Sequence, residues 1–328
     1  MKIGTRVSPD WLERPDDLAF LKQIGVDCVD ITLDMCPGYT ETGGRTNREG
    51  LQMIAEKLDA AGLVVERANC LSSSMQGIYL GTEDGERQLD HLVNNVTLCG
   101  EIGFPVVGMQ CFSASQFPGL AARDTHSFVE GRGGYSHLRV DVDQSQGHAT
   151  PEGAPTVEEI WERTLSIYRA VVPAAESVGT RIAMHGNDPP VPVFYGVPQI
   201  LYDFDTFDRL FTEVPSDHNG MTFCVGTRYE SGQDVFEGIR RFGSKIFHVH
   251  FRNVRGRIPE QGWYEEGIPD EGDLNMFEVA RALKDAGYEG ALDYDHIMNL
   301  INDEGGRSYI AYCVGHTRGI LQALDALG

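Results

Sequence analysis

The sequence predicts an α/β fold, a closed (β/α)8 TIM barrel formed by residues 1–328 as a single domain. Short apolar runs alternate with longer amphipathic stretches along the whole chain, which is typical of a parallel sheet covered by helices. The length of 328 residues fits one barrel, and no linker divides the chain. No Gly-rich dinucleotide-binding turn follows the first strand, so we favour a closed barrel over an open doubly wound sheet.

The predicted strands are rich in Val and Ile and are bounded by Gly or turn residues. They cover residues 3–7, 28–33, 63–67, 105–109, 181–184, 221–225, 246–251 and 290–294. The predicted helices cover residues 11–24, 47–61, 84–103, 156–178, 203–213, 232–242, 275–286 and 306–327. The helix over 156–178 opens with a capping box, Thr156-x-x-Glu159, and ends before Gly179.

Two segments are too long to be simple connections. Residues 111–155 follow the fourth predicted strand, and residues 252–274 follow the seventh. Both leave the carboxyl-terminal ends of strands, where barrel active sites lie. We therefore expect two long loops that cover a substrate.

Composition excludes several classes of partner. The formal net charge of −22 and the pI of about 4.7 disfavour nucleic acid and anionic membrane surfaces, but not a small anionic substrate held by a local cation or metal. The seven cysteines are irregularly spaced and form no CxxC pair, which argues against a disulfide framework. With no apolar leader and no membrane-length apolar run, we expect a soluble cytoplasmic protein.

Four consecutive predicted strands carry metal-capable side chains at or near their ends: His185, Cys224, His250 and Asp295. In a barrel these side chains share one rim, where two imidazoles, a thiolate and a carboxylate suit a divalent transition metal. Each residue also has a structural alternative, as a core cysteine or as a hydrogen-bonded histidine. The coincidence on neighbouring strands is what favours the metal site.

Further polar residues flank these four. His296 is a candidate general base or acid beside Asp295. Arg252 and Asn253 follow His250, and the guanidinium could fork onto a substrate carboxylate or instead form a salt bridge with an acidic residue. Asn187 and Asp188 form a rigid turn after the fifth strand, and we include both as candidate substrate-binding residues.

Two more pairs of residues complete the set of candidate site residues. Tyr309 and Tyr312 lie near the start of the last helix, where a phenol could donate a proton or simply pack against the barrel. His248 alternates with His250 on one strand, so it lies one layer deeper in the barrel on the same face.

Several motifs resemble those of the mannonate dehydratase family. Residues 183–190 resemble the family's His-Pro-x-Asp-Pro-Pro motif, and residues 219–226 its Asn-Gly-x-Thr-x-Cys-x-Gly motif. Residues 247–254 resemble Phe-x-His-x-Arg-Asn-Val, and residues 293–296 resemble Pro-Asp-His. The likeness runs from about residue 180 to residue 300 with order and spacing preserved.

The resemblance implies a xylose-isomerase-like barrel with a divalent metal, Mn²⁺ or Fe²⁺. It implies a hydro-lyase of glucuronate catabolism that converts D-mannonate to 2-keto-3-deoxy-D-gluconate. His185, Cys224, His250 and Asp295 match the family's metal ligands, and His296 matches its catalytic histidine. The Pro-Gly pair that precedes the family's late catalytic tyrosine is absent, so its counterpart stays open between the two tyrosines named above.

Two other functions stay open. The same barrel serves metal-dependent sugar isomerases, epimerases and keto-sugar eliminases, which need no clamp for a carboxylate. A non-catalytic sugar-binding protein is the third alternative, although binding alone does not need converging metal ligands. By analogy with other barrels we expect a homo-oligomer, a dimer or a tetramer.

Overall fold

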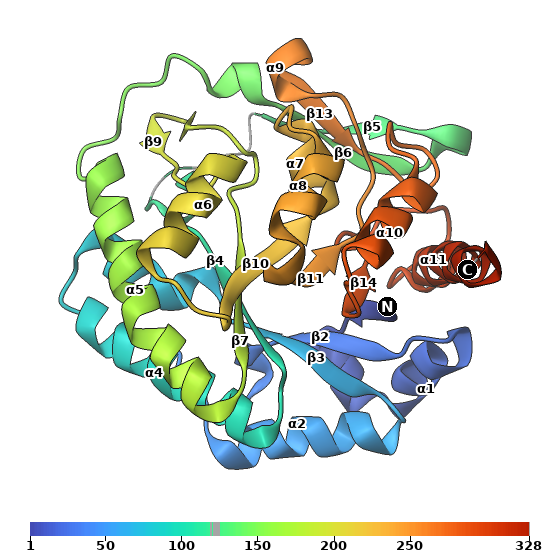
Figure 1. Cartoon of the computed structure of the whole chain (residues 1–328), viewed down its shortest axis with the longest axis horizontal. Helices are drawn as coiled ribbons and strands as arrows, with labels where there is room; N and C mark the ends of the chain where they lie inside the picture. Colours follow the sequence, from blue (N-terminus) through green and yellow to red (C-terminus); the bar gives the residue numbers. More distant parts are fainter. Residues whose placement is uncertain (119, 121–124, 328) are drawn as a thin grey trace.

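The computed structural model describes residues 1–118, 120 and 125–327. Its centre is a closed barrel of parallel strands in the order β1-β14-β11-β10-β7-β4-β3-β2 (Figure 1). The barrel strands are β1 (Lys2–Arg6), β2 (Cys28–Thr32), β3 (Val64–Asn69), β4 (Val106–Gln110), β7 (Arg181–His185), β10 (Asn219–Cys224), β11 (Ile246–His250) and β14 (Ala291–Asp293). The closed barrel and its eight predicted strands are confirmed.

The barrel strands form because their side chains are buried on both faces. Every residue of β10 and of β11 is buried, since one face points into the barrel and the other packs against helices. The parallel register pairs Gln110 with His185, Cys224 with His250, and His250 with Asp293. The carboxyl-terminal ends of these strands therefore meet at one rim.

Helices surround the barrel, as the sequence predicts (Figure 1). The longer ones are α1 (Pro15–Ile24), α2 (Arg48–Ala60), α4 (Gly85–Ile102), α5 (Val157–Val178), α6 (Phe204–Glu213), α8 (Val235–Phe242), α10 (Met276–Asp285) and α11 (Arg307–Leu327). The shorter ones are α3 (Gln76–Leu80), α7 (Val225–Glu230) and α9 (Ile258–Gln261). None of the helices in the described part of the chain is long and apolar enough to cross a bilayer.

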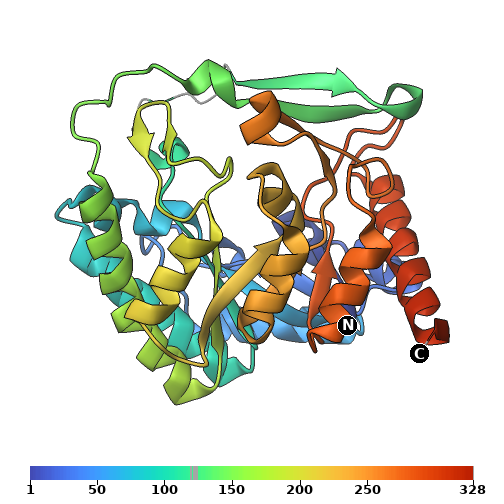
Figure 2. The same cartoon turned by 45° about the horizontal axis from the view of Figure 1, so that its top comes forward.

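The two long segments are not simple loops. They contribute β5 (His126–Glu130), β6 (Ser136–Asp141), β12 (Val254–Arg255) and β13 (Trp263–Glu266) to one antiparallel sheet in the order β12-β13-β6-β5. We call it the cap sheet, because it lies across the rim end of the barrel (Figure 2). A two-stranded ribbon, β8 (Val193–Phe194) with β9 (Val197–Pro198), lies in the connection after β7.

The capping box predicted for α5 is present. Thr156 accepts a hydrogen bond from the backbone N–H of Glu159 at 3.2 Å, and the Glu159 carboxylate accepts one from the backbone N–H of Thr156 at 2.8 Å. These two bonds satisfy donors that the first turn of a helix leaves free. They fix where the longest helix begins, directly after the segment that forms half of the cap sheet.

We expect Thr156→Ala to lower the free energy of unfolding by about 1 kcal/mol, the usual effect of losing a helix cap. Denaturant unfolding followed by circular dichroism measures the change. Thr150→Ala is the matched control, because Thr150 is exposed and makes no hydrogen bond to the described residues. Equal losses in the two variants would contradict the assignment of the cap.

Candidate metal and catalytic site

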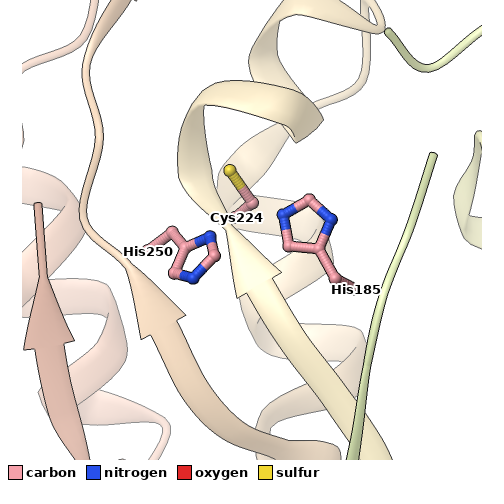
Figure 3. A group of neighbouring side chains, drawn as sticks. All are labelled: His185, Cys224 and His250. Atoms are coloured by element: carbon pink, nitrogen blue, oxygen red, sulfur yellow. The ribbon is translucent and has the colours of Figure 1, made fainter. Parts of the chain in front are cut away.

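Three metal-capable side chains converge at the rim. His185, Cys224 and His250 are the last residues of β7, β10 and β11, and their ligand atoms all lie within 4.8 Å of one another (Figure 3). Ligands about 2.0–2.3 Å from a single ion are separated by at most about 4.6 Å. Small side-chain movements would therefore allow all three to bind one ion.

The surroundings of His185 leave one nitrogen free for a metal. Its Nδ1 lies 2.7 Å from the carbonyl oxygen of Gly186, and a carbonyl only accepts, so Nδ1 must donate the hydrogen bond. The other ring nitrogen, Nε2, then carries a lone pair and points toward Cys224 (Figure 3). Burial lowers the pKa of His185 to about 4, which keeps the imidazole neutral, as metal ligation requires.

Cys224 is a buried thiol in the same cluster. Its Sγ accepts a hydrogen bond from the hydroxyl of Thr227 at 3.0 Å. Burial raises the pKa of Cys224, and the positive charge of Arg252 only partly offsets that effect. The thiolate therefore needs a further positive charge beside it, and a metal ion supplies such a charge.

His250 faces the cluster through a nitrogen that lacks a hydrogen bond. Its Nδ1 is buried, has no hydrogen-bond partner among the described residues, and lies 3.3 Å from Oδ2 of Asp295. Its Nε2 lies 2.9 Å from Nη2 of Arg67. Because a guanidinium only donates, Nε2 accepts here and Nδ1 holds the proton. Binding an ion through Nδ1 requires Arg67 to withdraw from Nε2.

Asp295, predicted as the fourth ligand, lies next to His250, one of the three converging side chains. It follows the end of β14 and has a positive φ of 69°, so the chain turns there instead of continuing the strand. Its Oδ1 lies 3.4 Å from Nη2 of Arg6, and its Oδ2 lies 3.5 Å from Nε2 of His296. Burial raises the pKa of Asp295, but His250 and His296 outweigh burial and hold it well below its usual range.

His296 lies beside Asp295 and is held from the cap sheet. Its Nδ1 lies 2.8 Å from Oε2 of Glu266, which belongs to β13. Burial lowers the pKa of His296, but Asp295 and Glu266 act more strongly and raise it to about 9. Its side chain is 40% exposed, so it can reach a bound molecule. Sequence reasoning missed Glu266, because the pairing of β13 with β12, which the sequence does not predict, brings it to the rim.

Arg252 is not a free carboxylate clamp in this fold. Its side chain is 1% exposed and ion-paired with four carboxylates. Nη2 lies 3.0 Å from Oδ2 of Asp188 and 2.9 Å from the hydroxyl of Thr227, while Nη1 contacts Glu266. Glu230 lies 3.5 Å from Nη2, and Asp295 lies 3.8 Å from Nε. Arg252 therefore neutralises buried acids, which is the alternative that the sequence left open.

Two predicted substrate-binding amides are structural. Asn253 donates hydrogen bonds of 2.9 and 3.0 Å to the carbonyl oxygens of Pro269 and Leu274. Asn187 donates one of 2.7 Å to the carbonyl oxygen of Phe112. Both side chains are almost fully buried, and their hydrogen-bonding groups are used by the backbone. Both amides fix the loops around the rim, and Asn187 also lines the metal pocket. Their substrate-binding roles remain predictions.

Asp188 does face the site, as predicted. Its Oδ2 pairs with Arg252, and its Oδ1 accepts a hydrogen bond of 2.7 Å from the hydroxyl of Tyr264. Burial raises the pKa of Asp188, but Arg252 and His185 outweigh burial and hold it at about 2. Tyr264 lies in β13 and is a second cap-sheet residue that sequence reasoning missed.

The two tyrosines predicted as proton donors lie elsewhere. Tyr309 is buried, with its ring nearly perpendicular to that of Tyr294 at a centroid distance of 5.8 Å. Tyr312 is 38% exposed and contacts the ion pair of Arg132 with Asp270. Neither lines the cavities described below. The first turns of α11 direct one ring into the core and the other toward the cap sheet, so the role of proton donor remains a prediction for both.

Two cavities meet at the site. The first, the metal pocket, has a volume of about 220 Å³, and its lining includes His185, Asp188 and His250. The second, the outer pocket, has a volume of about 740 Å³ and extends under the cap sheet. Arg6, Asp295 and His296 line both. The two pockets therefore adjoin at these three side chains, and a molecule in the metal pocket can contact residues that also line the outer pocket.

A buried polar layer supports the rim from below. Nδ1 of His248 lies 2.7 Å from Oε2 of Glu66, and its Nε2 lies 3.9 Å from Oδ2 of Asp293. Nη2 of Arg67 lies 2.5 Å from Oδ2 of Asp30, while Nη1 lies 2.9 Å from the hydroxyl of Thr222. All of these side chains are buried. His248 thus lies in the layer that the period of the strand predicts.

The chain is similar in sequence to several mannonate dehydratases. A mannonate dehydratase from Streptococcus agalactiae serotype Ia is 26% identical over 292 residues, which cover 81% of this chain and 82% of that protein. One from Thermotoga petrophila is 29% identical over 177 residues, 52% of this chain and 49% of that protein. The chain thus spans about half the length of some curated relatives it matches.

The fold agrees with these relatives. The crystal structure of mannonate dehydratase from Streptococcus suis serotype 2 superposes with a TM-score of 0.83 at 22% identity, covering 98% of this chain and 93% of that one. The family model of D-mannonate dehydratase (UxuA) matches residues 155–327. This match covers more than half of the chain and includes the five rim residues His185, Cys224, His250, Asp295 and His296. The chain belongs to the D-mannonate dehydratase (UxuA) family.

Proposed function

We propose that this chain is a metal-dependent hydro-lyase that converts D-mannonate to 2-keto-3-deoxy-D-gluconate and water. The observation that carries the proposal is the convergence of His185, Cys224 and His250 at the rim of a barrel of this family. We propose further that the chain acts as one domain, in a cytoplasmic dimer or tetramer.

We propose that His185, Cys224, His250 and Asp295 hold a divalent ion, Mn²⁺ or Fe²⁺. The donor set fits such an ion, because it combines neutral imidazole, thiolate and carboxylate groups. The buried thiol of Cys224, whose pKa burial raises, points to a missing positive charge beside it. When bound, the ion supplies a Lewis acid that polarises substrate oxygens.

We propose that His296 transfers the proton between the protein and the substrate. The reaction removes a proton from C2 of the sugar acid and expels the hydroxyl from C3. Glu266 fixes Nδ1 of His296 at 2.8 Å, so Nε2 is the atom that faces the pocket beside Asp295. A histidine held on one nitrogen by a carboxylate keeps a single orientation, which general acid–base catalysis requires.

The cap sheet and Arg252 prepare the site for this chemistry. Glu266 and Tyr264 reach the rim from β13, and both interact there with acidic or basic groups of the barrel. Arg252 holds Asp188, Glu230 and Glu266 together although all three carry negative charge when ionised. Such pre-arranged charges act strongly where the cap excludes water.

Incubation of the metal-loaded protein with a panel of sugar acids and neutral ketoses tests the proposed function. We expect D-mannonate alone among them to give a 2-keto-3-deoxy acid, identified by mass spectrometry and NMR. Removal of metal by chelation should stop the reaction, and Mn²⁺ or Fe²⁺ should restore it. Isomerised or epimerised ketoses in place of a dehydration product would favour the alternative enzyme class.

We expect Cys224→Ala to lose most of its bound metal, because the variant lacks the thiolate of the donor set. Metal content per chain, measured by plasma mass spectrometry, gives the result. Cys99→Ala is the control, since Cys99 is an equally buried cysteine in α4, outside the site. Full stoichiometric metal in Cys224→Ala would rule out the ligand assignment.

We expect His296→Asn to lower kcat about 100- to 10,000-fold, the usual contribution of one proton-transfer group, while bound metal stays stoichiometric. Steady-state kinetics and metal analysis on the same preparation give both quantities. His148→Asn is the control, because His148 is exposed and far along the chain from the rim residues. Unchanged kcat in His296→Asn would remove His296 from the mechanism.

A further inference from the structure

One cation at the site is partly exposed and makes only long contacts with its acidic neighbours. Arg6 is the last residue of β1 and lines both the metal pocket and the outer pocket. It is the only lysine or arginine among the described residues that line the metal pocket. Its side chain is 40% exposed, in contrast to the buried Arg252. Arg6 is therefore the cation that a molecule in the metal pocket can reach.

The acidic neighbours of Arg6 have closer partners. Nε of Arg6 lies 3.6 Å from Oδ2 of Asp30, but Nη2 of Arg67 lies 2.5 Å from the same oxygen. Oδ1 of Asp295 lies 3.4 Å from Nη2 of Arg6, while its Oδ2 faces His250 at 3.3 Å. The contact with Oδ1 is the one hydrogen bond that the side chain of Arg6 makes to the described residues. Most of its five N–H donors are therefore free to bind a ligand.

The charge around the pocket makes such a group necessary for an anionic substrate. The chain has a net charge of −22, and Asp188, Asp295 and Glu266 border the two cavities. A carboxylate that enters this region is repelled unless a positive charge faces it. Arg252 does not serve, because its guanidinium is buried among four carboxylates.

We propose that Arg6 binds the carboxylate of the substrate at the junction of the two pockets and so selects sugar acids over neutral sugars. The planar guanidinium can donate two parallel hydrogen bonds to a carboxylate, which a lysine cannot do. The substrate class rests on the proposed function, whereas the role of Arg6 in binding an anion is measured without turnover.

Calorimetric titration of wild-type protein, with and without Mn²⁺, compares D-mannonate with D-mannitol, its neutral counterpart. D-Gluconate and D-glucitol form a second such pair. We expect Arg6→Gln to weaken binding of the acids about 10- to 100-fold, as expected for losing a charged hydrogen-bonding partner. Binding of the neutral alditols should change less than about twofold. The affinity of Arg6→Lys for the acids should lie between those of the wild type and Arg6→Gln, because lysine keeps the positive charge but cannot donate two parallel hydrogen bonds.

Arg48→Gln is the matched control, because Arg48 is 48% exposed, lies in α2, and its removal changes the net charge equally. Circular dichroism confirms that each variant is folded, and Arg6→Lys decides the matter should Arg6→Gln fail to fold. Unchanged acid binding in a folded Arg6 variant overturns the proposal, and so does a wild-type protein that binds no acid better than its alditol.

These outcomes separate the two proposals. Acid binding that depends on Arg6, without formation of a 2-keto-3-deoxy product, would support the role of Arg6 and contradict the dehydratase. Where turnover occurs, we expect Arg6→Gln to raise KM more than it lowers kcat, because it removes a contact made to the bound substrate as well as to the transition state.

Discussion

Parallel closure of the barrel is the constraint from which the site follows. His185, Cys224 and His250 are far apart along the chain, yet β7, β10 and β11 are adjacent in the barrel, and Cys224 pairs with His250. A parallel sheet puts the ends of such strands at one edge, and barrel closure curves that edge around a common centre. Any shift by one residue would turn these side chains outward, so the strand register and the donor set depend on each other.

The second constraint is the compensation of charge. A site rich in carboxylates is stable only where cations lie among them, since an unpaired buried charge is costly. Arg67 meets this need inside the barrel, where it contacts Asp30, Thr222 and His250. Arg252 meets it at the rim. The terminal Nη atoms of both arginines are thus committed to the protein itself, and both side chains are buried.

The sequence predicts much of this fold, because barrel strands and their helices leave local patterns. The apolar runs predict the eight strands, and Thr156 with Glu159 predicts the start of α5. The cap sheet is missed, since β13 pairs with β6 across more than a hundred residues. Tyr264 and Glu266 are missed with it, because the sequence predicts no strand over residues 263–266.

The sequence does not show how the polar residues that follow β11 are used. Position in sequence shows that Arg252 and Asn253 follow a rim strand, but not whether their polar atoms are already used by neighbouring groups. In the fold those atoms are used by buried carboxylates and by loop carbonyls. Arg6 stands at the end of the first strand with no motif around it, yet its donors are nearly free. For polar residues at a crowded rim, unused hydrogen-bonding capacity, more than proximity, decides which of them can bind a substrate.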